Sequence, residues 1–193
     1  MPDVDASRSR LADALSAHAP QGEEEERDVA STLALVRTEP ACFSRSFFTP
    51  GHVTGSAFIV CASSGRVLLH HHRRLNAWLQ MGGHDDGERD AAATALREGR
   101  EESGLADLAF LSPAILDVDV HPIPAGKGEP PHLHHDVRYA LVTRTPGAIR
   151  RDEAESIDLR WFSPEDAAEA MGETGATRAL GKIRRLLLRT GAA

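Results

Sequence analysis

The chain has 193 residues, 41% of them hydrophobic and 26% charged, and a formal net charge of -7 at pH 7. This length and composition predict one globular domain with its own core, and the negative charge argues against a general nucleic-acid binder, which normally carries a basic surface. No apolar stretch approaches the ~20 residues of a membrane span, and the N-terminus has no basic-then-apolar signal segment. We therefore expect a cytoplasmic protein with a small-molecule partner, no nucleic acid and no membrane.

The first 45 residues predict one or two helices, broken at residues 20–22. The acidic run at residues 23–26 is expected to form a helix N-terminal turn, where the helix dipole favours negative charge; a partner-binding tail is the alternative. We expect residues 1–45 to be a helical extension packed on the core. Residues 46–193 then form the main domain, including a C-terminal helix.

Strand signals dominate from residue 53 onward. The predicted strands are 53–60, 66–69, 78–81, 114–120, 132–143 and 156–162. A helix between the third and fourth strands, and another that begins at Ser163-Pro164, predict a mixed sheet flanked by helices, an α/β fold. The amphipathic stretch 176–190 is expected to pack on the domain, with Leu186 and Leu188 widening its apolar face, in preference to lying on a membrane surface.

Other features are expected to be structural. Cys42 and Cys61 lie far apart and outside any CxxC pattern, so we expect buried free thiols in a reducing compartment. The basic run at residues 70–74 is expected to be an exposed turn at a strand end, the alternative being attraction of substrate phosphates. His18 and His52 carry no argument for a role.

Residues 82–105 read GGHDDGERDAAATALREGREESGL and contain the strongest chemical signal. Glu98, Glu101 and Glu102 share one face of a helix, where like charges repel by a few tenths of a kcal/mol per pair. Hard divalent cations such as Mg²⁺ take oxygen ligands and are commonly shared with substrate phosphates. The cluster therefore predicts a metal site that receives a phosphate ester, and a solvated surface helix is the alternative.

The ends of this helix are also predicted by its residues. Asp90 is expected to be the N-cap and Gly104 the C-terminal stop. The glycines before the helix suit a tight loop that returns a carbonyl oxygen towards a metal. They are Gly82, Gly83 and Gly87.

This segment resembles the Nudix box, in which GxxxxxE is followed by seven residues and then RExxEExG with aliphatic positions. The residues that match in spacing are Gly83, Arg97, Glu98, Glu101, Glu102, Gly104 and Leu105. Two positions differ. Arg89 stands where the pattern has a glutamate, with Glu88 one place early, and Gly99 replaces an aliphatic residue at a cost of up to ~1 kcal/mol in helix propensity.

The resemblance implies a Nudix-like α/β/α sandwich and a hydrolase that cleaves a diphosphate linkage in a nucleoside diphosphate derivative with Mg²⁺ or Mn²⁺. Glu98, Glu101 and Glu102 become metal ligands, the Gly83 carbonyl a further ligand, and Arg97 the residue that orients a glutamate. A box glutamate or another carboxylate of the cleft would be the general base. A non-catalytic nucleotide sensor and an isomerase acting on an allylic diphosphate stay open, as does a homodimer.

A second polar pattern occupies residues 117–138. Because side chains alternate along a strand, His132, His134, Asp136 and Arg138 are expected to share one face of their strand. Asp117, Asp119 and His121 alternate in the same way on the strand before the Pro/Gly loop. A transition-metal site, a phosphate held by Arg138 and Lys127, and a solvated polar face compete for this surface, and we favour the solvated face. The candidate substrate contacts are His84, Lys127, His132, His134, Asp136 and Arg138.

Overall fold

The computed structural model describes residues 4–126 and 128–190. The helices within these ranges are α1 (Val4–Ala17), α2 (Gly22–Thr38), α3 (Ala91–Ser103), α4 (Pro164–Met171) and α5 (Thr174–Thr190), with a 3₁₀ turn η1 (Pro146–Ala148). The strands are β1 (Gly51–Cys61), β2 (Val67–His72), β3 (Ala77–Leu79), β4 (Met81–His84), β5 (Ala109–Phe110), β6 (Asp117–Ile123), β7 (His132–Thr143) and β8 (Ser156–Phe162). No described helix is long and apolar enough to cross a membrane.

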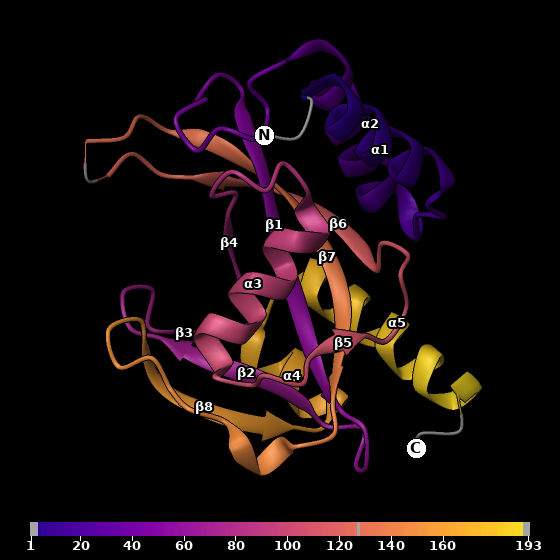
Figure 1. Ribbon diagram of the computed structural model, residues 1–193, viewed down its shortest axis with the longest axis vertical. Helices are drawn as coiled ribbons and strands as arrows, with labels where there is room; N and C mark the ends of the chain where they lie inside the picture. Colours follow the sequence, from indigo (N-terminus) through magenta and orange to yellow (C-terminus); the bar gives the residue numbers. More distant parts are fainter. Residues whose placement is uncertain (1–3, 127, 191–193) are drawn as a thin grey trace.

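The sheet is mixed and is built around two long parallel strands, β1 and β7 (Figure 1). Their register runs from Gly51 opposite Leu133 to Cys61 opposite Thr143. β2 and β4 pair antiparallel with β1, while β5 and β6 pair antiparallel with β7. The predicted mixed sheet and α/β fold class are confirmed.

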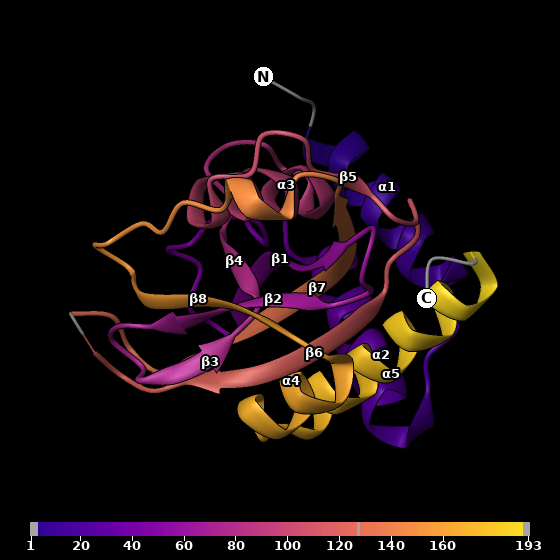
Figure 2. The same ribbon diagram turned by 90° about the horizontal axis from the view of Figure 1, so that it is seen from below.

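Helices cover both faces of the sheet, as the view from below shows (Figure 2). Along β1 the side chains alternate between two cores: Val53 and Ile59 belong to the core that includes α3, whereas Phe58 joins the core that includes α4 and α5. Every residue of β1 is buried, as is typical of a strand covered on both faces. The predicted layered α/β/α arrangement is thus confirmed.

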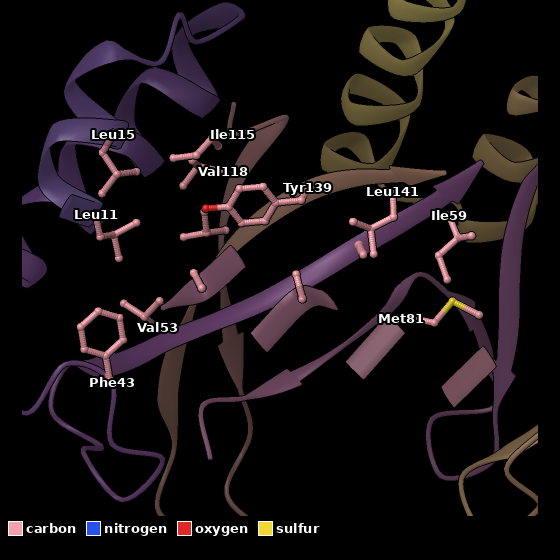
Figure 3. Close-up of a cluster of buried hydrophobic side chains, with 14 of the residues drawn as sticks. Leu11, Leu15, Phe43, Val53, Ile59, Met81, Ile115, Val118, Tyr139 and Leu141 are labelled. Carbon is pink, nitrogen blue, oxygen red and sulfur yellow. The ribbon is translucent and has the colours of Figure 1, made fainter. Parts of the chain in front are cut away.

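The N-terminal helices contribute to the first of these cores (Figure 3). Leu11 and Leu15 of α1 are buried in one cluster with Ile115, Val118 and Tyr139. Complete burial of a leucine side chain contributes about 1.5–3 kcal/mol. The two helices are therefore held to the sheet by apolar contact.

An internal ion pair ties α2 to α5. Glu25 lies in the first turn of α2, as the sequence predicts, but it is fully buried. Its carboxylate accepts hydrogen bonds from Lys182 Nζ at 2.5 and 2.6 Å and lies 2.7 Å from His18 Nε2. Burial opposes ionisation of Glu25, but the hydrogen bonds from His18 and Lys182 lower its pKa to about 2. The carboxylate of Glu25 therefore serves the interior and is not part of a partner-binding tail.

Three expectations from the sequence are wrong. β2 continues to His72, so the start of the basic run is strand, and His70 is buried against Ser156 at 2.9 Å. In α5, Leu188 is 65% exposed and does not widen the apolar face. The strand expected at 114–120 is shifted to Asp117–Ile123, because Ile115 and Leu116 pack as an irregular segment before it.

Gly99 is a position where the chain departs from the aliphatic residue of the box, and the structure explains why. A Cβ at Gly99 would lie 3.1 Å from Leu141 Cδ1 and 3.3 Å from Leu108 Cδ1, so the neighbouring leucines already occupy the space. We expect Gly99→Ile to lower the free energy of unfolding by about 1–3 kcal/mol through overpacking. Gly181→Ala in α5, where the nearest atom is 3.8 Å away, should raise it by up to ~1 kcal/mol. Urea denaturation gives the free energy of unfolding of both variants and of the unaltered chain. A Gly99→Ile variant more stable than the unaltered chain would contradict this packing.

Candidate active site

The glutamate-bearing helix α3 begins and ends where the sequence predicts. The side chain of Asp90 accepts hydrogen bonds from the backbone N–H groups of Ala92 and Ala93, at 3.0 and 3.3 Å. Gly104 ends the helix in the left-handed conformation, with φ 71°. Because both ends are capped by local residues, the positions of the three glutamates follow from the sequence.

Two glutamates of α3 meet the glycines of β4. Glu102 is buried, and its carboxylate accepts a hydrogen bond of 2.8 Å from the Gly82 backbone N–H. A Cβ at Gly83 would lie 2.3 Å from Glu98 Oε1, so glycine at this position leaves room for the Glu98 carboxylate beside the β4 backbone. The result is a narrow cradle of carboxylate and backbone groups between α3 and β4.

Arg97 connects the remaining box residues. Its guanidinium donates to Glu98 and Glu101 at 2.9 Å each, to Glu88 at 2.6 Å, and to the His84 carbonyl at 2.8 Å. Glu101 is the most open of the three helix glutamates, with 60% of its side chain exposed. Arg97 therefore holds the carboxylates of Glu88, Glu98 and Glu101 in position.

The displaced Glu88 keeps a supporting role because of the backbone beside it. Arg89 adopts a left-handed φ of 52°, and the Asp85 side chain accepts hydrogen bonds from the Gly87 and Arg89 backbone N–H groups. This turn brings the carboxylate of Glu88 onto Arg97 although it stands one place early in the box. From the sequence, the role of Glu88 stayed open because of its shifted position in the box.

The carboxylates of this cradle resist ionisation. Burial raises the pKa of Glu98, and burial raises the pKa of Glu102 to about 9, with Glu98 and Glu155 adding like charge. A positive charge beside these two buried carboxyl groups would lower their pKa values and restore the ionised form. The oxygen donor set fits a hard divalent cation.

A cavity of about 1030 Å³ joins this cradle to the polar face of the sheet. Its size is at the upper end of ordinary small-molecule sites. The predicted site residues that line it are Gly83, His84, Arg97, Glu98, Glu102, His134, Asp136 and Arg138. Glu101 and His132 lie outside the described lining, and Lys127 lies outside the described residues.

The polar face of β6 and β7 is buried at Asp117, Asp136 and Arg138 and half-buried at Asp119, His121 and His134, so the favoured solvated face is wrong. Arg138 is 2% exposed and forms ion pairs with Asp136 at 3.0 Å, Asp119 at 3.1 Å and Asp117 at 3.5 Å. Helix α5 covers this face, since a Cβ at Gly175 would meet Asp119. The negative charges of three aspartates more than neutralise the single positive charge of Arg138, which weakens this side chain as an anchor for a phosphate.

Sequence reasoning missed the contribution of β1 to this face. Thr54 and Ser56 donate hydrogen bonds of 3.1 and 2.7 Å to the carboxylate of Asp136, and His52 lies on the same side of the strand. The alternation His52-x-Thr54-x-Ser56 in the sequence indicates that these side chains share one face of the strand. That this face adjoins Asp136 follows only from the parallel pairing of β1 with β7.

A capped helix carrying arginine and glutamates thus lies beside a glycine-rich strand end, at the wall of a large cavity over a mixed sheet. A family model described as the NUDIX domain matches residues 51–181. The chain belongs to the Nudix family and is a Nudix-type pyrophosphohydrolase.

Solved structures with the same fold include three informative neighbours. C. elegans Ap4A hydrolase in a binary complex has a TM-score of 0.55 at 20% identity, over 71% of this chain and 98% of its own. A NUDIX-family hydrolase from Clostridium perfringens has a TM-score of 0.52 at 28% identity, over 70% and 97%. E. coli dihydroneopterin triphosphate pyrophosphohydrolase has a TM-score of 0.54 at 17% identity, over 67% and 92%. A search of curated sequences found no significant match.

Proposed function

We propose that the protein hydrolyses a diphosphate linkage in a nucleoside diphosphate-linked or related phosphorylated small molecule, with Mg²⁺ or Mn²⁺. The observation that carries the proposal is the convergence of Glu98, Glu102 and the backbone of Gly83 at one wall of the large cavity. Buried carboxyl groups of raised pKa, placed beside a cavity, are typical of functional sites.

Glu98, Glu101 and Glu102 would hold the cation, with the Gly83 carbonyl as a further ligand. When bound, Mg²⁺ or Mn²⁺ neutralises charge on the phosphoryl oxygens and lowers the pKa of an attacking water. Arg97 orients Glu98 and Glu101 by hydrogen bonds, and Gly82 orients Glu102. The chain thereby fixes the carboxylate oxygens before the substrate arrives, which lowers the reorganisation needed for reaction.

Positive charge for the substrate phosphates is available elsewhere in the cavity. Arg27, Arg45 and Arg74 line it on segments other than α3. Guanidinium groups form strong, geometrically specific hydrogen bonds with phosphate oxygens. The neighbouring folds named for Ap4A and for dihydroneopterin triphosphate are consistent with a nucleotide-like substrate for this chain.

A substrate screen tests the proposal. Nucleotide sugars, dinucleoside polyphosphates, ADP-ribose, NADH and damaged nucleoside triphosphates would be incubated with Mg²⁺ or Mn²⁺, and the products identified by mass. We expect release of a nucleoside monophosphate or phosphate that stops when EDTA removes the cation. Binding without turnover would indicate a sensor, and conversion of an allylic diphosphate to a product of unchanged mass would indicate an isomerase; either result overturns hydrolysis.

A further inference from the structure

Four histidines from three strands of the sheet lie together. They are His52 of β1, His84 of β4, and His132 and His134 of β7. The ring centroids of His52 lie 5.1, 5.1 and 4.9 Å from those of His84, His132 and His134. The parallel register of β1 with β7 places His52 directly opposite His134, which explains how residues 82 positions apart meet.

The nitrogen atoms of this cluster have the spacing of metal ligands. One ring nitrogen from each of His52, His132 and His134 lies within 4.8 Å of the others. His84 Nε2 lies 3.3 Å from His134 Nε2. Two nitrogens bound to one tetrahedral Zn²⁺ at the usual Zn–N distance of 2.0–2.1 Å are about 3.3–3.4 Å apart. The pair from β4 and β7 thus already has the separation of a tetrahedral edge.

Backbone carbonyls orient two of the rings for this purpose. His52 Nδ1 lies 3.1 Å from the Phe47 carbonyl oxygen, and His132 Nδ1 lies 2.8 Å from the Pro130 carbonyl oxygen. A carbonyl only accepts, so each Nδ1 carries the proton and each Nε2 keeps its lone pair. Histidine ligands of metals commonly donate their second ring N–H to a backbone carbonyl in this way.

The lone pair of His52 has no partner among the described residues. The side chain of His52 is 1% exposed, and its Nε2 is buried without a hydrogen bond. A buried polar atom left unsatisfied costs about 1–3 kcal/mol, so its presence calls for an explanation. A metal ion beside the atom provides one.

The alternation of side chains along β4 directs the imidazole of His84 away from the glutamate that faces Gly83. In β4 the Cβ direction of Gly83 points to Glu98. The next side chain, His84, therefore points to the opposite face of the strand.

We propose that His52, His132 and His134, with His84 as the fourth ligand, bind one Zn²⁺ or a similar transition metal. The site is independent of the proposed hydrolysis, because it shares no ligand with the carboxylates of α3. Imidazole nitrogens select borderline metals, whereas the all-oxygen cradle selects Mg²⁺ or Mn²⁺. Because His84 and His134 line the cavity, the ion would stand in the cavity wall and join the ends of three strands.

A cobalt titration of the untagged full chain tests the site. Tetrahedral Co²⁺ gives visible absorption bands that octahedral Co²⁺ on oxygen ligands gives only weakly, so the spectrum separates the two sites. We expect one equivalent of intensely absorbing Co²⁺ that Zn²⁺ displaces, and one equivalent of Zn²⁺ by elemental analysis after dialysis. His52→Gln and His134→Gln should each weaken binding by at least ~100-fold, the upper end of the loss caused by removing a supporting partner.

The controls distinguish this site from the glutamate site. Glu98→Gln and His71→Gln, the latter at a histidine stacked on Trp78, should give the same tetrahedral Co²⁺ absorption as the unaltered chain. Circular dichroism establishes that each variant is folded, and a double variant His84→Gln/His132→Gln replaces any single variant that is not. Unchanged tetrahedral absorption in folded His52→Gln and His134→Gln, absence of such absorption in the unaltered chain, or equal loss in Glu98→Gln would overturn the proposal.

Discussion

Glu102→Gln is expected to yield a protein that is more stable than the unaltered chain above neutral pH and no longer hydrolyses its substrate. Burial raises the pKa of Glu102 to about 9, compared with an ordinary value of 4.5. The folded state therefore holds a proton that the unfolded state releases above pH ~5. Stability due to the neutral carboxyl is complete below pH ~4.5 and is lost as the pH rises towards about 9.

Glutamine keeps the shape of the side chain and an oxygen for the Gly82 N–H, but it cannot ionise. In EDTA we expect Glu102→Gln to exceed the unaltered chain by roughly 1–3 kcal/mol at pH 8.5, the scale of an uncompensated buried polar group, and to match it at pH 5. Loss of one carboxylate should reduce kcat by roughly 10³-fold, since several kcal/mol of charge stabilisation is lost. Thermal unfolding at both pH values and an initial-rate assay check the two effects. Equal stabilities at pH 8.5 would show that Glu102 ionises normally.

Arg138→Met should destabilise the fold more than any other single change discussed above. Arg138 is 2% exposed and ion-paired with Asp117, Asp119 and Asp136, of which Asp117 and Asp136 are also buried. Its removal takes away the guanidinium paired with the buried carboxylate of Asp136, whereas Asp117 keeps ion pairs with Arg178 at 2.9 Å and Lys182 at 2.8 Å. Breaking a buried ion pair costs about 3–5 kcal/mol. Burial opposes ionisation of Asp119, whereas the hydrogen bond with His121 and the charge of Arg138 lower its pKa. The pKa of Asp119 should rise without Arg138, so the loss should be smaller near pH 4, where Asp119 can take up a proton.

The matched control is Arg184→Met, at an arginine whose ion pair with Glu165 is 3.1 Å long but whose side chain is 65% exposed. An exposed pair of this kind contributes about 0–1 kcal/mol. Urea denaturation of both variants at pH 7 and pH 4 gives the comparison. A loss of less than ~1 kcal/mol for Arg138→Met at pH 7 would mean that the aspartates are solvated rather than neutralised by this side chain.

The active-site helix could be predicted from the sequence because its determinants are local. Asp90 and Gly104 cap it within one turn of its ends, and the relative directions of Glu98 and Glu102 follow from the helical period. The role of Glu88 could not be predicted, since it depends on the left-handed backbone of Arg89, a residue that rarely takes this conformation.

The polar face of the sheet could be predicted only in part. Alternation placed His134, Asp136 and Arg138 on one side of β7, and the structure confirms that placement. Their burial depends on α5 and on β1, elements distant in sequence whose positions no local pattern fixes. For the same reason the importance of His52 appears only in the fold.

The central claim, that the α3 carboxylates bind the cation that supports hydrolysis, is tested most directly by the turnover of Glu101→Gln on the substrate found in the screen. Glu101 is exposed and linked only to Arg97 in the described structure, so its replacement should leave the fold intact. With Mg²⁺ or Mn²⁺ we predict a fall in kcat of roughly 10³-fold, with Glu169→Gln on α4 unchanged. Near-normal turnover by a folded Glu101→Gln variant would contradict the assigned metal site.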